Sequence, residues 1–325
     1  MEMILANANG KEIRTLLEND VDIDLGGSND FQLTISSGAC EQDISFQTRI
    51  FIPNTEYGGI IGTQNANTAR GAIELSGYTW RGMLNNKIIL PDQGQASKVV
   101  SGELNSILQD MIYHEYEGIF VIPNISTGIV IENYPFENYC TLLKGLSKML
   151  SSVSHRLSMK YIQQEKGISG YVEIQAVPIV DFSATIEYSQ DSQIHFSLME
   201  KRNGTNHMIC IESNASDAIH LYVQKDGSIG KAPFYKGIEE ITNIFEGNGS
   251  LDEVEKNGIN KLIEEMNYKK LDFDILDINE DLNIGDIVGG RDYTTGIILK
   301  KPIVRKILKI FKGVESIEYK VEGEE

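Results

Sequence analysis

Apolar residues alternate with polar ones near both ends of this 325-residue chain, and glycine-rich turns separate the alternating runs. Between residues 21 and 35, apolar side chains occupy every second position on both sides of a Gly-Gly turn. A period of two gives a strand with one dry and one wet face. Such runs recur about every ten residues through residues 1–95, which predicts a sandwich or barrel there.

The stretch from 281 to 319 shows the same chemistry near the C-terminus. Gly285 and Asp286 follow an apolar residue and precede a second apolar pair, so a turn leads into a strand. Further glycines bracket a polar turn over 291–295 between β-branched runs, which is typical of a hairpin. We therefore expect a small curled antiparallel sheet or barrel, whose glycines serve the backbone and not a ligand.

Helical periodicity replaces the alternation in the middle of the chain. Apolar stripes predict amphipathic helices over 98–117 and 137–154. A third helix is expected to start at Ser250, with Glu253 completing a capping box. Gly258 lies inside this third helix and is expected to cost about 1 kcal/mol relative to alanine.

The order of these patterns indicates a mainly β fold of the α+β class. A chain of this length can bury a core large enough for two or three domains. Two small β-barrel-like domains are expected to flank a helical insert and a mixed β region. The expected parts are an N-terminal β-barrel domain over 1–95, the helical insert over 96–165, the mixed β domain over 166–245, and a linking helix with the C-terminal β-barrel domain over 246–325.

The composition of the chain indicates which partners it can bind and in which compartment it is made. The formal net charge is −18, which makes the chain a poor general binder of nucleic-acid phosphates. Three widely spaced cysteines, Cys40, Cys140 and Cys210, indicate free thiols in a reducing compartment and not a disulfide framework. The sequence has no signal peptide and no apolar stretch long enough for a membrane span, so we expect synthesis in a cytoplasm.

The motifs that could indicate a catalytic or metal-binding site do not have the residue spacing that such a site requires. The acidic run from Asp20 to Gly26 places its glycine one position too late for a calcium loop. His207 and Cys210 have the spacing of metal ligands, but on a strand they point to opposite faces and they lack a partner pair. We expect no catalytic, cofactor-binding or metal site and hence no enzyme, and we interpret Trp80 as a core or interface anchor.

Two segments carry a resemblance to a known family. The run Asn-Ile-Gly-Asp-Ile-Val-Gly-Gly-Arg-Asp at 283–292, with Thr-Gly-Ile after it and Glu-Tyr-Lys-Val at 318–321, resembles the C-terminal barrel of the Gp37-like tail proteins of siphoviruses and related prophages. Residues 73–91, which include Trp-Arg-Gly at 80–82, are similar to the N-terminal barrel signature of that family. The two matches bracket most of the chain.

The resemblance implies a structural tail or baseplate hub without chemistry of its own. Such a hub is a homotrimer whose six barrels form a collar joining a sixfold tail tube to a spike or tail-tip protein, with the tape-measure protein as a further candidate partner. It is assembled in the bacterial host cytoplasm and resides at the tail tip or baseplate of a virion. The sequence leaves open a siphophage or a contractile, bacteriocin-like particle, and two other functions: a tail-associated cell-wall hydrolase and a carbohydrate-binding tail-tip module.

Overall fold

The computed structural model of the chain describes residues 1–16, 19–36, 44–67, 69, 71–116, 118–165, 167–184, 195–201, 203–212, 218–274, 282–291 and 298–322. The chain forms two compact units, and each is described by itself. The first unit comprises Met1–Phe196, Asp272–Arg291 and Lys300–Glu325, and the second comprises Ser197–Leu271 and Asp292–Leu299. Strands predominate over helices among the described residues, which confirms a mainly β fold of the α+β class.

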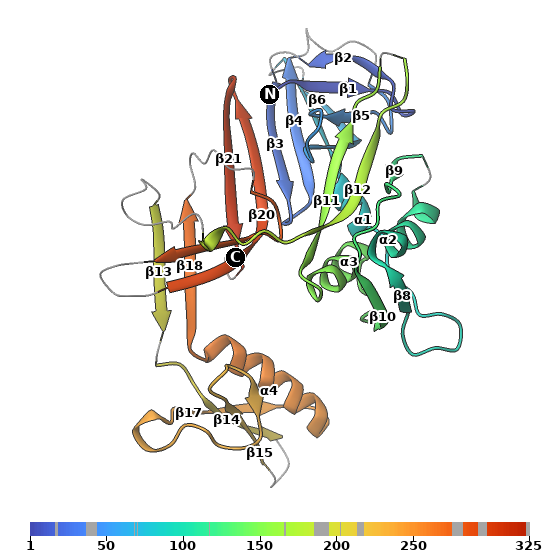
Figure 1. Cartoon of the computed structure of the whole chain (residues 1–325). Coiled ribbons are helices and arrows are strands. Elements are labelled where there is room, and N and C mark those ends of the chain that lie inside the picture. Colours follow the sequence, from blue (N-terminus) through green and yellow to red (C-terminus); the bar gives the residue numbers. More distant parts are fainter. Residues whose placement is uncertain are drawn as a thin grey trace. The chain divides into compact units, whose positions relative to one another are not determined.

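A ten-stranded sheet is the centre of the first unit (Figure 1). Its strands are β1 (Met3–Ala6), β2 (Glu12–Leu16), β3 (Asn19–Leu25), β4 (Asp30–Ser36), β5 (Arg49–Phe51), β6 (Gly58–Asn67), β7 (Ala72–Thr79), β19 (Ile287–Arg291), β20 (Ile298–Phe311) and β21 (Val314–Val321). The pairing order is β19-β20-β3-β4-β7-β6-β5-β1-β2, and β21 also pairs with β20.

The two ends of the chain meet in this one sheet. The long strand β20 pairs antiparallel with β3, with Lys306 opposite Leu25. Leu308 of β20 belongs to the same apolar cluster as Leu5 of β1, although these strands lie far apart in the pairing order. The sheet therefore curls around a common core.

The structure does not show the two separate β-barrel-like domains that the sequence predicted. The described strands close no barrel, and the C-terminal hairpin β20–β21 extends the N-terminal sheet. Alternation identifies the buried face of a strand but not its pairing partner, so two β-rich ends are compatible with two domains or with one shared sheet. The division of the chain into 1–95, 96–165, 166–245 and 246–325 stays a prediction.

The helices of the first unit pack with two smaller sheets. These elements are α1 (Trp80–Asn85), α2 (Leu104–Ile112), α3 (Leu142–Ser151), the pair β8 (Val99–Glu103) and β10 (Val130–Pro135), the sheet β11-β12-β9 (His155–Ile162, Tyr171–Pro178, Phe120–Val121), and the 3-10 turns η2 (Tyr113–Glu115) and η3 (Phe182–Ala184). The helices α2 and α3 confirm the central parts of the helices predicted over 98–117 and 137–154, and the side chains of Glu103 and Thr141 cap their N-termini. Residues 99–103 of the first prediction instead form strand β8, because they pair with β10. Trp80, Leu108 and Leu146 belong to one apolar cluster that joins these elements.

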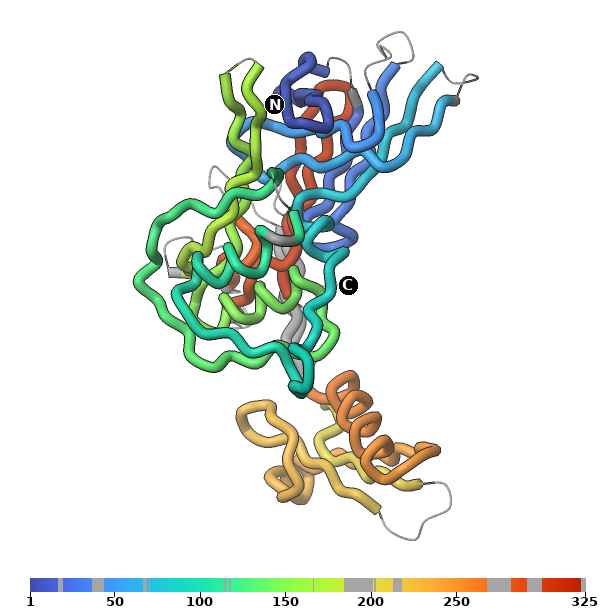
Figure 2. The backbone as a smooth tube through the Cα atoms, turned by 90° about the vertical axis from the view of Figure 1, so that its right-hand side faces the viewer, coloured from blue at the N-terminus to red at the C-terminus, as the bar shows by residue number. Residues whose placement is uncertain are grey.

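The second unit contains a four-stranded sheet with one helix against it, the orange helix beside the yellow strands in Figure 2. The sheet has the order β16-β15-β14-β17 (Ile229–Gly230, Ala218–Val223, His207–Glu212, Thr242–Gly247), the helix is α4 (Leu251–Glu265), and η5 (Gly237–Glu239) is a 3-10 turn. The strands β13 (His195–Lys201) and β18 (Tyr268–Asp274) form a separate two-stranded pair, in which each strand includes residues assigned to both units. Met208, Leu221 and Leu262 form the core between sheet and helix. The helix confirms the third prediction, including the capping box of Ser250 and Glu253.

The glycine inside α4 makes a contact that helix propensity does not reveal. A Cβ atom at Gly258 would overlap Sγ of Cys210 on β14. We therefore expect Gly258→Ala to destabilise the second unit by about 1–3 kcal/mol through overpacking, whereas propensity alone predicts a gain of about 1 kcal/mol. The measurement is urea unfolding followed by far-UV circular dichroism.

Two further variants separate overpacking from other effects of this glycine. Adding Cys210→Ala removes the sulfur and should restore most of the stability lost in Gly258→Ala. Asn257→Ala, at the neighbouring exposed position, should change stability by no more than about 0.5 kcal/mol. A more stable Gly258→Ala variant would show that the helix moves freely away from β14.

Candidate functional site

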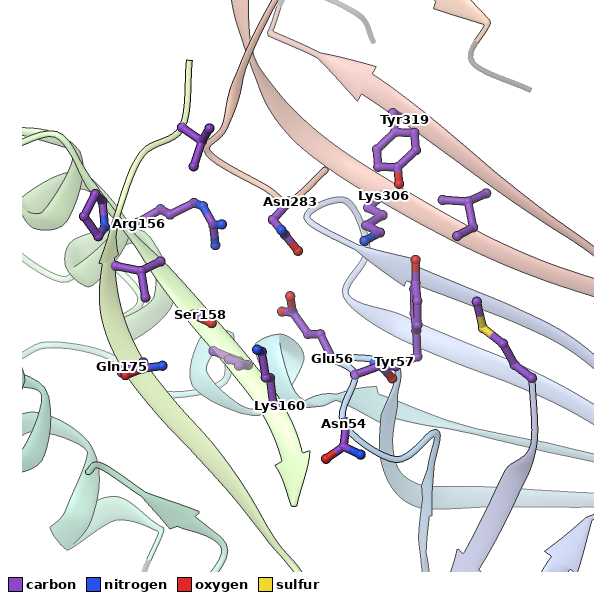
Figure 3. A pocket seen from close by; sticks show the side chains of 17 residues that line it. Asn54, Glu56, Tyr57, Arg156, Ser158, Lys160, Gln175, Asn283, Lys306 and Tyr319 are labelled. Carbon is purple, nitrogen blue, oxygen red and sulfur yellow. The ribbon is translucent and has the colours of Figure 1, made fainter. Parts of the chain in front are cut away.

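A cavity of about 680 Å³, lined by both polar and apolar side chains, lies in the first unit, between the β11–β12 hairpin and the β20–β21 hairpin (Figure 3). The turn that contains Asn54, Glu56 and Tyr57, between β5 and β6, completes its wall. Side chains from segments far apart in the sequence, including Arg156 and Lys306, face this common space (Figure 3). The cavity is the first candidate for a functional site.

The Gly-Asp turn singled out in the sequence supplies an ion pair beside this cavity. Asp286 is fully buried, and its Oδ1 accepts a hydrogen bond from Arg156 Nε at 2.7 Å. The same carboxylate accepts the backbone N–H groups of Val180 at 3.0 Å and Asn283 at 3.1 Å. Asp286 therefore ties the start of β19 to β11 and to the segment after β12.

The second motif of the resemblance supplies another internal ion pair. Arg81 is 3% exposed and pairs with Glu56 through Nε, while its Nη2 donates to Glu56 Oε2 at 3.3 Å. Trp80 lies in the core with its ring 5.7 Å from that of Tyr161, which fits the interpretation of a core anchor. A Cβ atom at Gly82 would overlap the backbone oxygen of Asn29, so this position requires glycine.

The lysine in the cavity wall is also held by internal groups. Lys306 is buried, and its Nζ donates to the backbone oxygen of Leu282 at 2.9 Å. The same ammonium lies 5.4 Å from the ring centroid of Tyr57 and 5.6 Å from that of Tyr319, within the range of cation–π attraction. Strands β20 and β21 are thereby joined to the turn before β6.

These contacts determine what the cavity can do chemically. Arg156, Glu56 and Lys306 already bind groups of the protein, and the described lining residues include no histidine or cysteine. The lining also contains the hydroxyl groups of Thr55 and Ser158 and the ammonium group of Lys160. The contacts of Arg156, Glu56 and Lys306 fix the relative positions of the segments that carry them.

The motifs weighed in the sequence occupy other places. Asp24, from the acidic run at 20–26, accepts hydrogen bonds from the turn residues Gly27 and Ser28 and pairs with Arg305 of β20. Asp24 therefore stabilises the turn after β3 and the pairing of β3 with β20. Among the described residues no cluster of three or more histidine, cysteine or carboxylate side chains is arranged to hold a metal ion.

The described cysteines lie in the core, and the described helices are too short or too polar to cross a membrane. Cys140 and Cys210 are buried free thiols whose pKa burial raises, which disfavours the reactive thiolate, and Cys40 lies outside the described residues. Within the described part of the chain no helix combines the length and the apolar character that a membrane crossing requires.

An apolar patch on the surface of the first unit is the second candidate site. Ile88, Leu90 and Tyr139 are 49%, 61% and 69% exposed, and we call these three residues the apolar patch. Residues 87–90 run antiparallel to 139–142, because Ile89 N–H donates to Cys140 O and Leu142 N–H donates to Lys87 O. This register places Leu90 opposite Tyr139. The ion pairs Lys87–Glu115, Lys98–Asp92, Lys144–Glu137 and Lys148–Glu137 flank the segments that carry the patch.

Sequence reasoning missed Arg156, Glu56 and the apolar patch. The ion-pair partners lie about 25 and 130 residues apart in the chain, and neither pair has a fixed sequence spacing that marks it. A weak signal existed in the patch, where three consecutive apolar residues at 88–90 precede a proline outside any clear alternation.

The similarity of this chain to known proteins lies in its fold. No protein-family model matches the chain, and no curated protein matches it. The 43 kDa tail protein of prophage MuSo2 from Shewanella oneidensis matches with a TM-score of 0.51 at 13% identity, over 99% of this chain and 98% of that chain. The prophage tail protein gp18 from Listeria monocytogenes matches at 0.50 and 10% identity, over 100% and 96%.

A chain of the p2 virion baseplate in its activated conformation also matches, with a TM-score of 0.50 at 9% identity, over 100% of this chain and 99% of that one. The chain has the fold of phage tail and baseplate proteins. This tail-protein fold extends over both compact units, since each match covers nearly the entire chain. At such low identity the agreement concerns the fold, and the function of this chain is a proposal.

Proposed function

We propose that this chain is a structural hub protein of a phage tail or baseplate, in a virion or in a phage-derived contractile, bacteriocin-like particle. Three copies would form a collar that joins the tail tube to the spike or tail-tip protein. The observation that carries this proposal is the end-to-end agreement of the fold with tail and baseplate proteins. The likeness to the Gp37-like tail proteins at 73–91 and 283–292 supports the same function.

The ion pairs and hydrogen bonds around the cavity support a function that depends on a rigid shape and not on a chemical reaction. Asp286, Glu56 and Lys306 each connect segments that are distant in the sequence, within one unit. Such links resist deformation when neighbouring proteins push on the unit, because breaking a buried pair leaves an uncompensated charge. The charged groups of Arg156, Glu56 and Lys306 at the cavity are thus committed to internal contacts, which favours a non-enzymatic role.

The apolar patch is our candidate for a contact between copies. The chain carries a net charge of −18, so most surfaces of two copies repel each other. Around the patch, by contrast, seven charged side chains pair with one another, four lysines with three carboxylates. An apolar centre with a near-neutral polar rim is the anatomy of a protein–protein contact.

The proposal assigns partners and a location. The partners are two further copies of the chain, the tail tube protein, and a spike or tail-tip protein, with the tape-measure protein as a candidate in the lumen. No specific nucleic-acid binding is expected for so acidic a chain. The protein would assemble in the bacterial host cytoplasm and then reside at the tail tip or baseplate.

The deciding experiment is co-expression with the tail tube and spike proteins of the same particle. Light scattering after gel filtration should give the mass of a trimer in the complex, and particle imaging should place the chain at the end of the tube. A chain that stays monomeric with both partners present contradicts the proposal. Clearing of peptidoglycan or binding of a bacterial glycan by the purified chain would favour the hydrolase or the carbohydrate-binding module.

A substitution in the apolar patch tests the contact between copies. Leu90→Asp buries an unpaired charge in the contact and should weaken association at least about tenfold, which corresponds to about 1.4 kcal/mol. Ile125→Asp is the matched control, because Ile125 is 62% exposed in the same unit and lies outside the patch. Dissociation constants from analytical ultracentrifugation compare the variants, and equal weakening by both would remove the patch from the contact.

A further inference from the structure

Strand β11 presents two cations with free donor atoms to the cavity of the first unit. Arg156 uses its Nε for Asp286, and its two Nη atoms have no hydrogen-bond partner among the described residues. Lys160 is exposed, and no carboxylate in the described part of the chain pairs with its ammonium group. Figure 3 shows both side chains on the cavity side of β11. The cavity therefore offers a guanidinium edge and an ammonium group to a ligand.

Bases outnumber acids in the described lining, although the chain as a whole has a net charge of −18. Lys306 is a third base there, and the carboxylate of the lining, Glu56, is already paired with Arg81. Glu173 lies opposite Lys160 in the strand register, but it does not line the cavity and no ion pair joins the two. A group that enters the cavity meets a surplus of positive charge, so the cavity favours a ligand with carboxylates.

The edge of β11 also presents an unpaired peptide group to this cavity. Tyr161 N–H donates to Thr55 O and Tyr161 O accepts from Asn54 N–H, both at 2.9 Å, so its backbone groups point away from β12. Alternation along the antiparallel ladder gives Met159 the same orientation. Met159 is 3% exposed and lines the cavity, and these N–H and C=O groups have no partner among the described residues. Because buried backbone groups are nearly always paired, this edge is suited to an incoming amide.

The spacing along β11 matches that of an extended peptide. Arg156, Ser158 and Lys160 lie on one face of the strand, about 7 Å apart from one to the next. An extended peptide repeats its side chains at the same interval, so carboxylates four residues apart in it can reach Arg156 and Lys160. Val177 and Val180 add apolar contacts to the lining. The volume of about 680 Å³ is that of a site for a drug-sized ligand and far exceeds one carboxylate.

We propose that this cavity binds an acidic segment of another protein in extended form. One carboxylate of the segment binds both Nη atoms of Arg156, and a second carboxylate pairs with Lys160. One residue of the segment exchanges both backbone hydrogen bonds with Met159. Asp286 keeps the Nε of Arg156, so binding leaves the internal ion pair intact. The site acts within a single copy of the chain and does not depend on a collar of three copies.

Fluorescence anisotropy with the full chain tests this proposal. The probe is a short, labelled and blocked peptide in which glutamate alternates with serine, and its glutamine analogue is the comparison. We expect saturable binding of the glutamate peptide and at least about tenfold weaker binding of the glutamine peptide, because the charge-assisted hydrogen bonds are lost. No binding of the glutamate peptide at about 1 mM would overturn the proposal.

Citrate separates a peptide site from a site for free anions. It carries several carboxylates but no amide, so it cannot replace the hydrogen bonds to Met159. We expect citrate to displace the labelled peptide less well than the unlabelled peptide does. Equal displacement by citrate would overturn the assignment to a peptide.

Three variants outside the core locate the binding site. Lys160→Met removes an exposed ammonium group and should weaken binding of the glutamate peptide about tenfold. Lys11→Met is the matched control, because Lys11 is also exposed in the first unit but does not line the cavity, and it should change binding by less than about twofold. Glu173→Gln removes the carboxylate opposite Lys160 and should strengthen binding about twofold. Equal weakening by Lys160→Met and Lys11→Met would overturn the proposal.

Discussion

Replacing Asp286 with alanine should lower the free energy of unfolding of the first unit by about 3–5 kcal/mol. The substitution leaves the Arg156 guanidinium without its carboxylate and removes the acceptor for two backbone N–H groups. Removing one partner of a buried ion pair destabilises the protein by more than the intact pair stabilises it, because the remaining charge is buried without compensation. The fluorescence of Trp80, the single tryptophan, reports unfolding of this unit during urea titration.

A surface pair in the same unit is the control for this prediction. Asp181 pairs with Lys300 at 3.4 Å, and both side chains are about half exposed. Lys300→Met removes only this surface pair and should therefore cost less than about 1 kcal/mol. The double variant Arg156→Met/Asp286→Ala should recover part of the loss, since it removes both charges. A loss below 1 kcal/mol in Asp286→Ala would show that water compensates the guanidinium at this place.

Replacing Arg305 with methionine should cost about 2 kcal/mol near neutral pH. Arg305 binds the buried Asp24 through Nε at 3.0 Å and Nη2 at 2.6 Å, and so connects β20 to β3. Hydrogen bonds to a charged group contribute about 1.5–3 kcal/mol each. The expected loss stays near the lower end, because Gly27 and Ser28 continue to donate to Asp24 in the variant.

The pH dependence of this variant has a definite sign. Burial of Asp24 acts to raise its pKa, but the hydrogen bonds from Arg305 and Ser28 outweigh burial and hold the pKa below its ordinary value of 3.8. A carboxyl whose pKa is lower in the folded state contributes its full stability above the ordinary value, and this contribution is lost as the pH falls through the folded-state pKa. The difference between the original chain and Arg305→Met should therefore be constant above about pH 5 and shrink below 3.8.

Unfolding in urea at several pH values between 7 and 3 checks this sign. Lys301→Met is the control, because Lys301 lies on the same strand as Arg305 and pairs with the exposed Glu322 at 3.5 Å. It should change stability by less than about 1 kcal/mol. A difference between Arg305→Met and the original chain that grows toward acidic pH would contradict the role of Asp24.

The sequence by itself determined the local structure of this protein. Apolar stripes at helical spacing identified α2, α3 and α4, and the capping box fixed the start of α4 at Ser250. Alternation identified the dry faces of β3 and β4, because a strand next to a core must present an apolar residue at every second position. These features depend on neighbours within a few residues, and the sequence displays such neighbours directly.

Only the tertiary structure decided which distant segments meet. It joined β20 to β3 in one sheet, placed Asp286 beside Arg156, and made Gly258 a necessity for packing against Cys210. It also brought His207, His220 and Glu240 into one chain of hydrogen bonds. The physical reason is that strand pairing and buried ion pairs are stabilised by contacts between residues far apart in the chain, and periodicity and spacing along the sequence describe only one partner of each contact.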